Sequence, residues 1–465
     1  MAGDERGRLI HVVGFVPWAF KYVNQQHEGV ATEWKMVQVL SAFNAFVDAD
    51  ACCIDGMANA AFFATLPLPP RFVQEPPLSL QALQQAGFVR AGTQDVVPRL
   101  YVSFYVGDYD SAAWVYNELK DRWDDADRGQ VPLGWALDAE LSWRFPPAFL
   151  YALNTTTSKD RVVSGDSGAG YLNPTQLLPP RAPSGLPPAN GTWAAHNAPL
   201  YAQFDVRFTG FLINGDAGAM TPAAERTYAP FSPLGVVDEF DPVQGATTRL
   251  NGRMPVFSQR DLPGGSNATE AAATILAWYN ASDPGPQFFV WRSVLQYPSY
   301  YAQVSQLLAS KGGGTVAVVD PHVLSALARA HLSGDNSHQV AYEPEHVQPL
   351  APRAGSSVSL TMTVRNDGWA PLLANYSMCA AFVAGASGAG SGVSAGGGAG
   401  AGQRTCVQLG ANVESGARAS VRAHVRVPAT SGERVLQYQL VLDDGVTGFD
   451  QFGNPPVRIS MHVEE

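Results

Sequence analysis

The sequence is poor in charged residues, and the few basic ones are outnumbered. Of 465 residues only 15% are Asp, Glu, Lys or Arg, against roughly 25% in an average soluble chain. The 30 basic residues face 41 acidic ones, for a formal net charge of -11. Proteins that neutralise nucleic-acid phosphates need clustered Lys and Arg. We therefore expect no nucleic-acid partner.

Long apolar runs are also lacking. Residues 368–403 carry no charge, but proline, asparagine and serine interrupt the first half and glycine and serine fill the second. A spanning helix needs about 20 predominantly apolar residues, so we expect no membrane span. The first ten residues, MAGDERGRLI, contain two acids and no apolar core, so they form no signal peptide. Either the mature chain starts here or an upstream segment is missing.

Cysteine is scarce, with four residues in the chain. Cys52 and Cys53 are adjacent in an apolar segment, which is typical of core residues. Cys379 and Cys406 lie in strand-like runs on either side of one loop, which favours a disulfide. Five N-x-S/T sequons, where chance gives roughly two, favour a glycoprotein of the secretory pathway. Their asparagines are Asn154, Asn190, Asn267, Asn280 and Asn375.

Glycine and proline are abundant, with 45 and 34 residues, and short apolar runs alternate with helical patterns over residues 9–332. Apolar runs of four to eight residues predict the buried strands of a parallel sheet. These runs are 9–16, 51–54, 100–106, 132–137, 161–164, 210–214, 235–237, 255–258, 288–291 and 315–319. Helices are predicted at 31–44, 111–123, 271–279, 299–309 and 322–331. We predict an α/β fold with a (β/α) barrel-like domain over residues 9–335. An open doubly wound sheet is the alternative.

Three later segments have a different character. Residues 176–200 are rich in Pro, Ala, Gly and Asn, which predicts an irregular surface loop. Residues 336–352 show neither a helical nor a strand period and are interpreted as a linker. Short alternating runs over 353–465 predict a smaller antiparallel β-sandwich as an accessory domain. Within it, the Gly/Ala/Ser segment 385–402 is expected to be a disordered insertion.

In a parallel barrel, the residues that follow each strand meet at one mouth. Acids follow several of the predicted strands, and aromatic residues lie near them. Two carboxylates can cleave a glycosidic bond, and flat aromatic rings stack on sugar rings. The candidate catalytic residues are Asp108, Asp110, Asp138, Glu140 and Asp166. The candidate substrate-binding residues are Trp18, Lys21, Trp135, Trp143 and Tyr171.

Simpler roles are open for some of these positions. Asp108 or Asp110 could cap the helix that follows, and Asp320 is best explained as a helix N-cap. Asp238 and Glu239 could be solvated loop acids. Each aromatic residue taken alone is more often a core residue than a sugar platform.

Other chemistries find little support. Ser167 lies in a G-D-S-G segment, but Ala169 breaks the G-x-S-x-G form of a nucleophile elbow. His338, Glu343, Glu345 and His346 match no common metal-ligand spacing. The sequence contains neither an H-x-x-x-H pair on a helix nor a G-x-G-x-x-G after the first strand. We therefore expect no metal and no cofactor.

The segment GAGYLNP at 168–174 resembles the signature of the GxGYxYP family of putative glycoside hydrolases. Gly168, Gly170, Tyr171 and Pro174 match it, and Asn173 stands where the family has a second Tyr. GFVPWAFKY at 14–22, HEGVATEW at 27–34 and GDYDSAAW at 107–114 are also similar to family members. The resemblance covers about residues 9–335. It implies a sugar-processing barrel, and it implies that an N-terminal domain usual in the family is absent from this chain.

Two functional hypotheses follow. The first is a secreted glycoside hydrolase that acts on a poly- or oligosaccharide by carboxylate acid/base chemistry. The second is a non-catalytic carbohydrate-binding or cell-surface interaction protein on the same scaffold. The sequence does not set the oligomeric state, the sugar or the stereochemical outcome.

Overall fold

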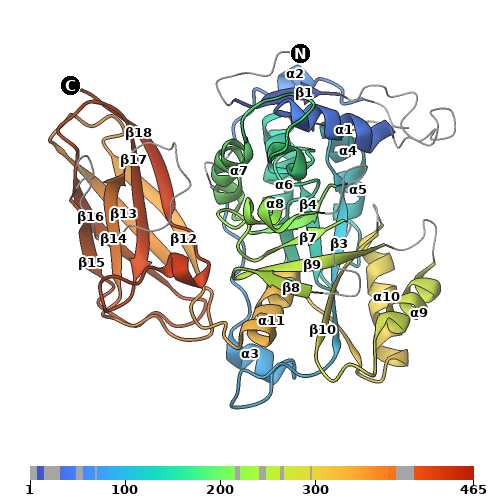
Figure 1. Ribbon diagram of the computed structural model, residues 1–465. Coiled ribbons are helices and arrows are strands. Elements are labelled where there is room, and N and C mark those ends of the chain that lie inside the picture. The colour runs from blue at the N-terminus through green and yellow to red at the C-terminus, as the bar shows by residue number, and fades with distance from the viewer. Residues whose placement is uncertain are drawn as a thin grey trace. The chain divides into compact units, whose positions relative to one another are not determined.

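The chain folds into two compact units, shown in the computed structural model of Figure 1. The first unit comprises Met1–Glu75 and Val96–Leu332, and the second comprises Pro76–Asp95 and Ser333–Glu465. The structure describes residues 8–14, 32–48, 56–68, 71–214, 220–239, 248–261, 267–293, 296–383 and 403–465.

A parallel sheet forms the centre of the first unit. Its strands follow the order β5-β4-β3-β10-β9-β7-β6, and all neighbours along this path are parallel. In addition, β11 pairs with β3 in parallel and β8 pairs with β9 in antiparallel fashion. The bounds are β3 Leu100–Tyr109, β4 Leu133–Leu137, β5 Asp160–Val163, β6 Phe208–Leu212, β7 Gly235–Asp238, β8 Thr248–Asn251, β9 Met254–Asp261, β10 Gln287–Arg292 and β11 Val316–Val318. The first unit is therefore α/β, as the apolar runs predict.

The two end strands of this sheet also approach each other. Beyond β5, Ser164 forms an isolated parallel bridge with Thr209 of β6. The Ser164 amide donates to the Phe208 carbonyl at 3.1 Å, and the Gly210 amide donates to the Ser164 carbonyl at 2.5 Å. These bonds bring the first and last strands of the path together at one point.

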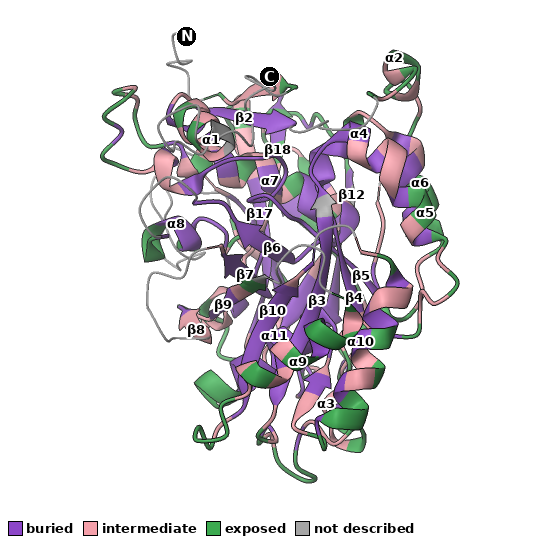
Figure 2. Cartoon of the chain, turned by 90° about the vertical axis from the view of Figure 1, so that its right-hand side faces the viewer, coloured by how far each residue is buried: buried purple, intermediate pink, exposed green. Residues whose placement is uncertain are grey.

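Helices flank the sheet. Figure 2 shows the sheet strands buried, whereas α9 and α10 carry exposed faces. The α-helices of this unit are α1 Thr32–Ala42, α2 Ala60–Phe63, α4 Ala112–Trp114, α5 Lys120–Trp123, α6 Pro146–Asn154, α7 Asn190–Phe204, α8 Pro222–Arg226, α9 Ala268–Trp278, α10 Pro298–Lys311 and α11 Pro321–Ser333. A large hydrophobic cluster joins helix and strand side chains.

Helix α7 corrects the expectation of an irregular loop over 176–200. It begins at Asn190 and contains Pro199. Its buried side chains recur at helical spacing, at Trp193, Asn197, Leu200, Tyr201 and Phe204. This apolar stripe packs into the core of the unit, and tertiary burial outweighs the weak helix propensity of the segment.

The first strand of the chain lies outside the central sheet. β1 (Ile10–Val13) and β2 (Ala45–Asp48) form a separate two-stranded parallel sheet. The run at 9–16 therefore contributes no strand to the central sheet, contrary to the barrel prediction. The predicted strand at 51–54 lies outside the described residues.

Two antiparallel sheets share one hydrophobic core in the second unit. One has the order β12-β13-β16 and the other β15-β14-β17-β18. The bounds are α3 Leu80–Gln85, β12 Val340–Gln348, β13 Ser357–Asn366, β14 Ser377–Val383, β15 Thr405–Gln408, β16 Arg418–Arg426, β17 Gly432–Val441 and β18 Val457–Val463. Residues 340–348, interpreted from the sequence as part of a linker, form β12 and pair with β13.

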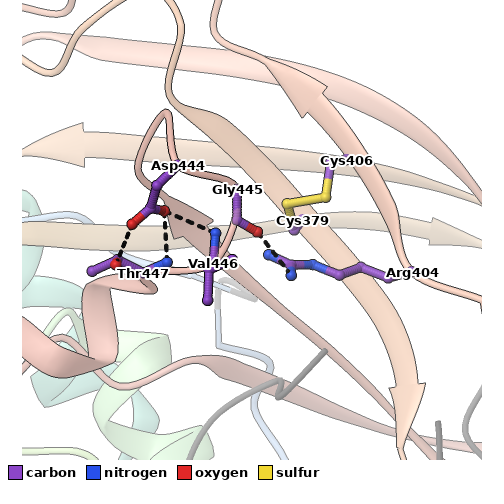
Figure 3. The surroundings of a disulfide bond; sticks show 7 residues. All are labelled: Cys379, Arg404, Cys406, Asp444, Gly445, Val446 and Thr447. Atoms are coloured by element: carbon purple, nitrogen blue, oxygen red, sulfur yellow. Dashed lines mark hydrogen bonds between the residues drawn. A yellow bond between two sulfur atoms is a disulfide. The ribbon is translucent and has the colours of Figure 1, made fainter. Parts of the chain in front are cut away.

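The predicted disulfide between Cys379 and Cys406 is confirmed. The two residues lie directly opposite each other on β14 and β15. Nearby, Arg404 donates to the carbonyl of Gly445 in a turn that Asp444 stabilises (Figure 3). The disulfide links the two strands on either side of residues 384–402, so it holds the ends of the predicted insertion together. The insertion itself lies outside the described residues.

Among the described residues, no helix is both long enough and apolar enough to span a membrane.

Candidate active site

Buried acids gather where the central strands end. Asp110 follows β3, Asp138 and Glu140 follow β4, and Asp166 lies in the loop after β5. All four are almost completely buried, with exposed fractions of 4% or less. Parallel strands place their carboxyl ends at one edge, so the topology brings these four candidates together.

The turn after β4 places two of the acids. Asp138 is the extended N-cap residue of a short 3-10 helix, Ala139–Trp143, which carries Glu140 in its first turn. The Asp138 Oδ1 atom accepts a hydrogen bond from the Gly165 amide at 2.8 Å and lies 3.3 Å from the Ser164 hydroxyl. Asp138 thus ties the end of β4 to the end of β5.

The loop after β5 has an unusual backbone. Asp166 and Ser167 adopt positive φ angles of 46° and 76°, and Gly168 and Gly170 follow at 127° and 122°. Positive φ angles are strained for residues other than glycine. A hydrogen bond from a neighbouring helix holds the loop: Asn197 Oδ1 accepts from the Ala169 amide at 2.7 Å. Contacts of this kind stabilise the strained backbone conformation.

Neighbouring acids influence the ionisation of Asp138 and Glu140. Burial raises the pKa of Asp138 well above its usual range, and the charges of Glu140 and Asp110 raise it further. Burial also raises the pKa of Glu140 well above its usual range, with added repulsion from Asp48, Asp166 and Asp110. Neither oxygen of Glu140 has a hydrogen-bond partner among the described residues. Burial and the neighbouring acids therefore both favour the protonated form of the Glu140 carboxyl.

Asp48, at the end of β2, is a member of this cluster that the sequence analysis missed. Its side chain is 3% exposed, is paired with Arg144, and lies 3.8 Å from His11 Nε2. Burial raises its pKa, while Arg144, His11 and the Ala112 amide oppose that rise. The available signal was the apolar run AFVD at 45–48, which ends in an acid like the other strands of the site.

Of the predicted substrate-binding residues, Trp135 is in the wrong place. Its side chain is fully buried, donates from Nε1 to Asp160 Oδ1 at 2.8 Å, and packs on Trp123. In this structure Trp135 is part of the hydrophobic core.

The remaining predicted binding residues differ in exposure. Trp143 is 47% exposed and lies edge-on to His196, and Tyr171 is 4% exposed. Burial lowers the pKa of His196, whose Nε2 lies 2.8 Å from the Ala169 carbonyl oxygen. Trp18, Lys21 and the side chain of Asp108 lie outside the described residues.

Helix capping does not account for Asp110. The N-cap of α4 is Ser111, whose Oγ accepts from the Trp114 amide. Asp320, by contrast, accepts from the His322 and Val323 amides at the start of α11. Asp238 is fully buried and paired with Arg249, so it is no solvated loop acid.

In the part of the chain that the structure describes, no three His, Cys, Asp or Glu side chains are grouped so that they could hold a metal ion.

The Ser167 side chain has a structural role, because it accepts a buried hydrogen bond. Its side chain is fully buried, and its Oγ accepts from the Ile213 amide at 2.8 Å. We expect Ser167→Ala to cost about 1 kcal/mol of stability through this lost bond and to leave turnover within about twofold of wild type. Thermal unfolding and steady-state kinetics on the same preparation measure both effects. Complete loss of turnover in a folded variant would instead indicate a serine nucleophile.

The first unit is thus an α/β structure with buried carboxylates at the carboxyl edge of a parallel sheet. Residues 99–329 match the model of the GxGYxYP putative glycoside hydrolase C-terminal domain. The resemblance seen in residues 168–174 is thereby confirmed.

Solved structures give weaker similarities. A hydrolase described as putative, from Bacteroides thetaiotaomicron VPI-5482, is 18% identical with a TM-score of 0.48, over 64% of this chain and 55% of that one. An alkylpurine DNA glycosylase of Pseudomonas fluorescens is 13% identical with a TM-score of 0.19, over 42% and 44%. A β-glucosidase from intestinal bacteria is 11% identical with a TM-score of 0.18, over 78% and 50%. This chain thus spans little more than half the length of the first of these structures, and no curated protein matches it.

Proposed function

We propose that this protein is a glycoside hydrolase that cleaves a poly- or oligosaccharide with two carboxyl groups. One observation carries the proposal. Glu140 is a completely buried carboxyl with no hydrogen-bond partner among the described residues, and burial and neighbouring acids raise its pKa well above the usual range. A raised pKa of this kind is what a general acid needs near neutral pH.

In this mechanism the Glu140 carboxyl donates its proton to the glycosidic oxygen as the bond to the anomeric carbon breaks. A second, ionised carboxylate then either bonds to the anomeric carbon or takes a proton from the attacking water. Asp110 and Asp166 are the candidates for this role. Asp138 is less suited, because the Gly165 amide and the Ser164 hydroxyl hold its Oδ1 atom.

The rest of the site would bind the sugar. The exposed ring of Trp143 offers a stacking surface, while Tyr171 anchors the loop after β5. Asp108, Trp18 and Lys21 remain proposed members of the same mouth. The Ser164–Thr209 bridge between the end strands supports a closed barrel as the scaffold.

A secretory-pathway location also remains a proposal, with a simple structural support. Four sequon asparagines, Asn154, Asn267, Asn280 and Asn375, are exposed or partly exposed, and Asn190 is partly exposed. A glycan could therefore be attached at these positions without disturbing a buried side chain.

Hydrolysis of a glycan panel by the full chain tests the proposed function. We expect at least one neutral poly- or oligosaccharide to be cleaved, and Asp110→Asn to lower kcat by at least about 10²-fold through loss of the ionised partner. Reducing-end release and chromatography of the products measure both. The matched control is Asp121→Asn, an exposed acid of α5, which should leave kcat unchanged.

Two outcomes would contradict this assignment. If Asp110→Asn and Asp166→Asn both hydrolyse the glycan at the wild-type rate, the carboxylate assignment is wrong. If wild type binds a glycan saturably and cleaves none, the protein is a carbohydrate-binding scaffold that lacks the chemistry.

A further inference from the structure

The GxGY segment forms the contact surface for β2. The Val47 amide donates to the Tyr171 carbonyl at 3.0 Å, and the Tyr171 amide donates to the Val47 carbonyl at 2.9 Å. A Cβ at Gly170 would lie 2.3 Å from the ring of Phe46, which neighbours Val47. The absence of a side chain at Gly170, with its φ of 122°, therefore leaves the space that Phe46 fills.

This contact fixes the position of the last residues of β2. The next residue of the strand is Asp48, which is buried beside the acids that follow β3, β4 and β5. Arg144 pairs with Asp48. It lies directly after the 3-10 helix that carries Glu140, so one short turn supplies both the buried acid and the cation that holds Asp48.

Several charged groups influence the ionisation of Asp48 and of Glu140. Asp48 is faced by His11 on β1, by Arg144, and by the Ala112 amide at the start of α4. The charges of Asp48, Asp166 and Asp110 raise the pKa of Glu140, and the charge of Glu140 raises that of Asp138. Of the three acids that repel charge on Glu140, Asp48 contributes most.

We propose that Asp48 is a positioning residue of the candidate site: the Gly168–Tyr171 loop holds β2 so that the Asp48 carboxylate pairs with Arg144 and fixes the end of the short helix that carries Glu140. This inference rests on the proposed function for its catalytic meaning. It adds a residue from outside the segment 99–329, and it gives the Gly-x-Gly-Tyr signature a physical role, because a side chain at Gly170 would displace β2.

The test measures the protonation of the Glu140 side chain directly, so it does not depend on turnover. Infrared difference spectra between a protein and its Glu140→Gln counterpart isolate the protonated-carboxyl band of Glu140, which is followed from pH 4 to pH 9. In the Asp48→Asn background we expect this band to disappear at lower pH than in wild type, because a repelling charge is gone. Asp48→Glu, which keeps the charge, should restore the midpoint toward that of wild type.

Two further variants separate the effect of moving β2 from a general loss of stability. Gly170→Ala keeps every charge but displaces Phe46, so we expect its midpoint to move in the same direction as in Asp48→Asn. Asp160→Asn is the matched control, because Asp160 is also a buried acid paired with an arginine, Arg128, at the other end of β5. It should lower thermal stability without moving the midpoint.

Outcomes for the two proposals can be told apart. An unchanged midpoint in folded Asp48→Asn overturns the role of Asp48, whether or not a glycan is cleaved. A shifted midpoint in a protein that cleaves no glycan contradicts the proposed hydrolase activity but supports the role of Asp48 beside Glu140. If turnover is found, the alkaline limb of its kcat/KM profile should move to lower pH in Asp48→Asn.

Discussion

Glu140→Gln is expected to lower kcat by about 10³-fold and, at neutral pH, to raise the unfolding temperature. The amide keeps the shape of the carboxyl but has no acidic proton to give to the leaving oxygen. KM should change much less than kcat, because Glu140 acts on the bond being broken and not on the bulk of the glycan. Steady-state kinetics on the best substrate of the panel, with calorimetry on the same samples, measures both effects.

The stability effect has a defined sign and pH window. In the folded state the pKa of Glu140 lies above its value in the unfolded chain, so the folded protein binds the extra proton. Below the unfolded value of about 4.3 the group is neutral in both states and has no pH-dependent effect. As the pH rises above that value, wild type loses stability that Glu140→Gln keeps, so the gap between the two should widen toward neutral pH.

Glu118→Gln is the comparison variant for this experiment. Glu118 is a partly exposed acid paired with Arg122 four residues along the chain. Glu118→Gln should leave kcat unchanged. A Glu140→Gln variant that retains wild-type kcat, or one whose stability falls relative to wild type as the pH rises, would contradict the assignment of Glu140 as a buried acid.

The strands of the central sheet were predictable because burial on both faces leaves a signal in each strand alone. The runs at 100–106, 132–137, 161–164, 288–291 and others need no knowledge of their neighbours to be recognised. The acids that follow three of these strands were predictable for the same reason, since parallel topology brings them to one edge.

What escaped prediction depends on contacts between distant segments. Asp48 joins the cluster because Val47 pairs with Tyr171. No local sequence pattern at either residue predicts this pairing. Trp135 was predicted to bind sugar because it lies near the acids that follow the strand, but its ring packs against Trp123 and bonds to Asp160 in the core. Helix α7 was missed because the residues that stabilise it as a helix are in the core to which it packs.

Gly210→Ala is expected to cost about 3 kcal/mol of stability, more than an ordinary glycine replacement. A Cβ there would lie 1.9 Å from a ring carbon of Tyr105 and 3.0 Å from the Ser164 carbonyl oxygen. Tyr105, on β3, fills the space between Gly210 on β6 and Gly165 after β5, where a Cβ would meet its hydroxyl at 2.3 Å. Either the ring or the junction between β5 and β6 must move, and urea unfolding of the full chain measures the cost.

A double-mutant cycle identifies the cause. Tyr105→Ala alone leaves a cavity and should itself be destabilising, but adding Gly210→Ala to it should cost much less than in wild type, because the ring that the methyl group meets is gone. Gly191→Ala is the control, since Gly191 lies near the start of α7 and a Cβ added there would meet nothing within 4 Å; it should be neutral or slightly stabilising. If the two costs simply add, the ring is not what requires glycine at 210, and the close approach of β6 to Ser164 is the remaining cause. If Gly210→Ala is no more costly than Gly191→Ala, the end strands do not meet as tightly as their hydrogen bonds indicate, and the closed barrel proposed for the scaffold is wrong.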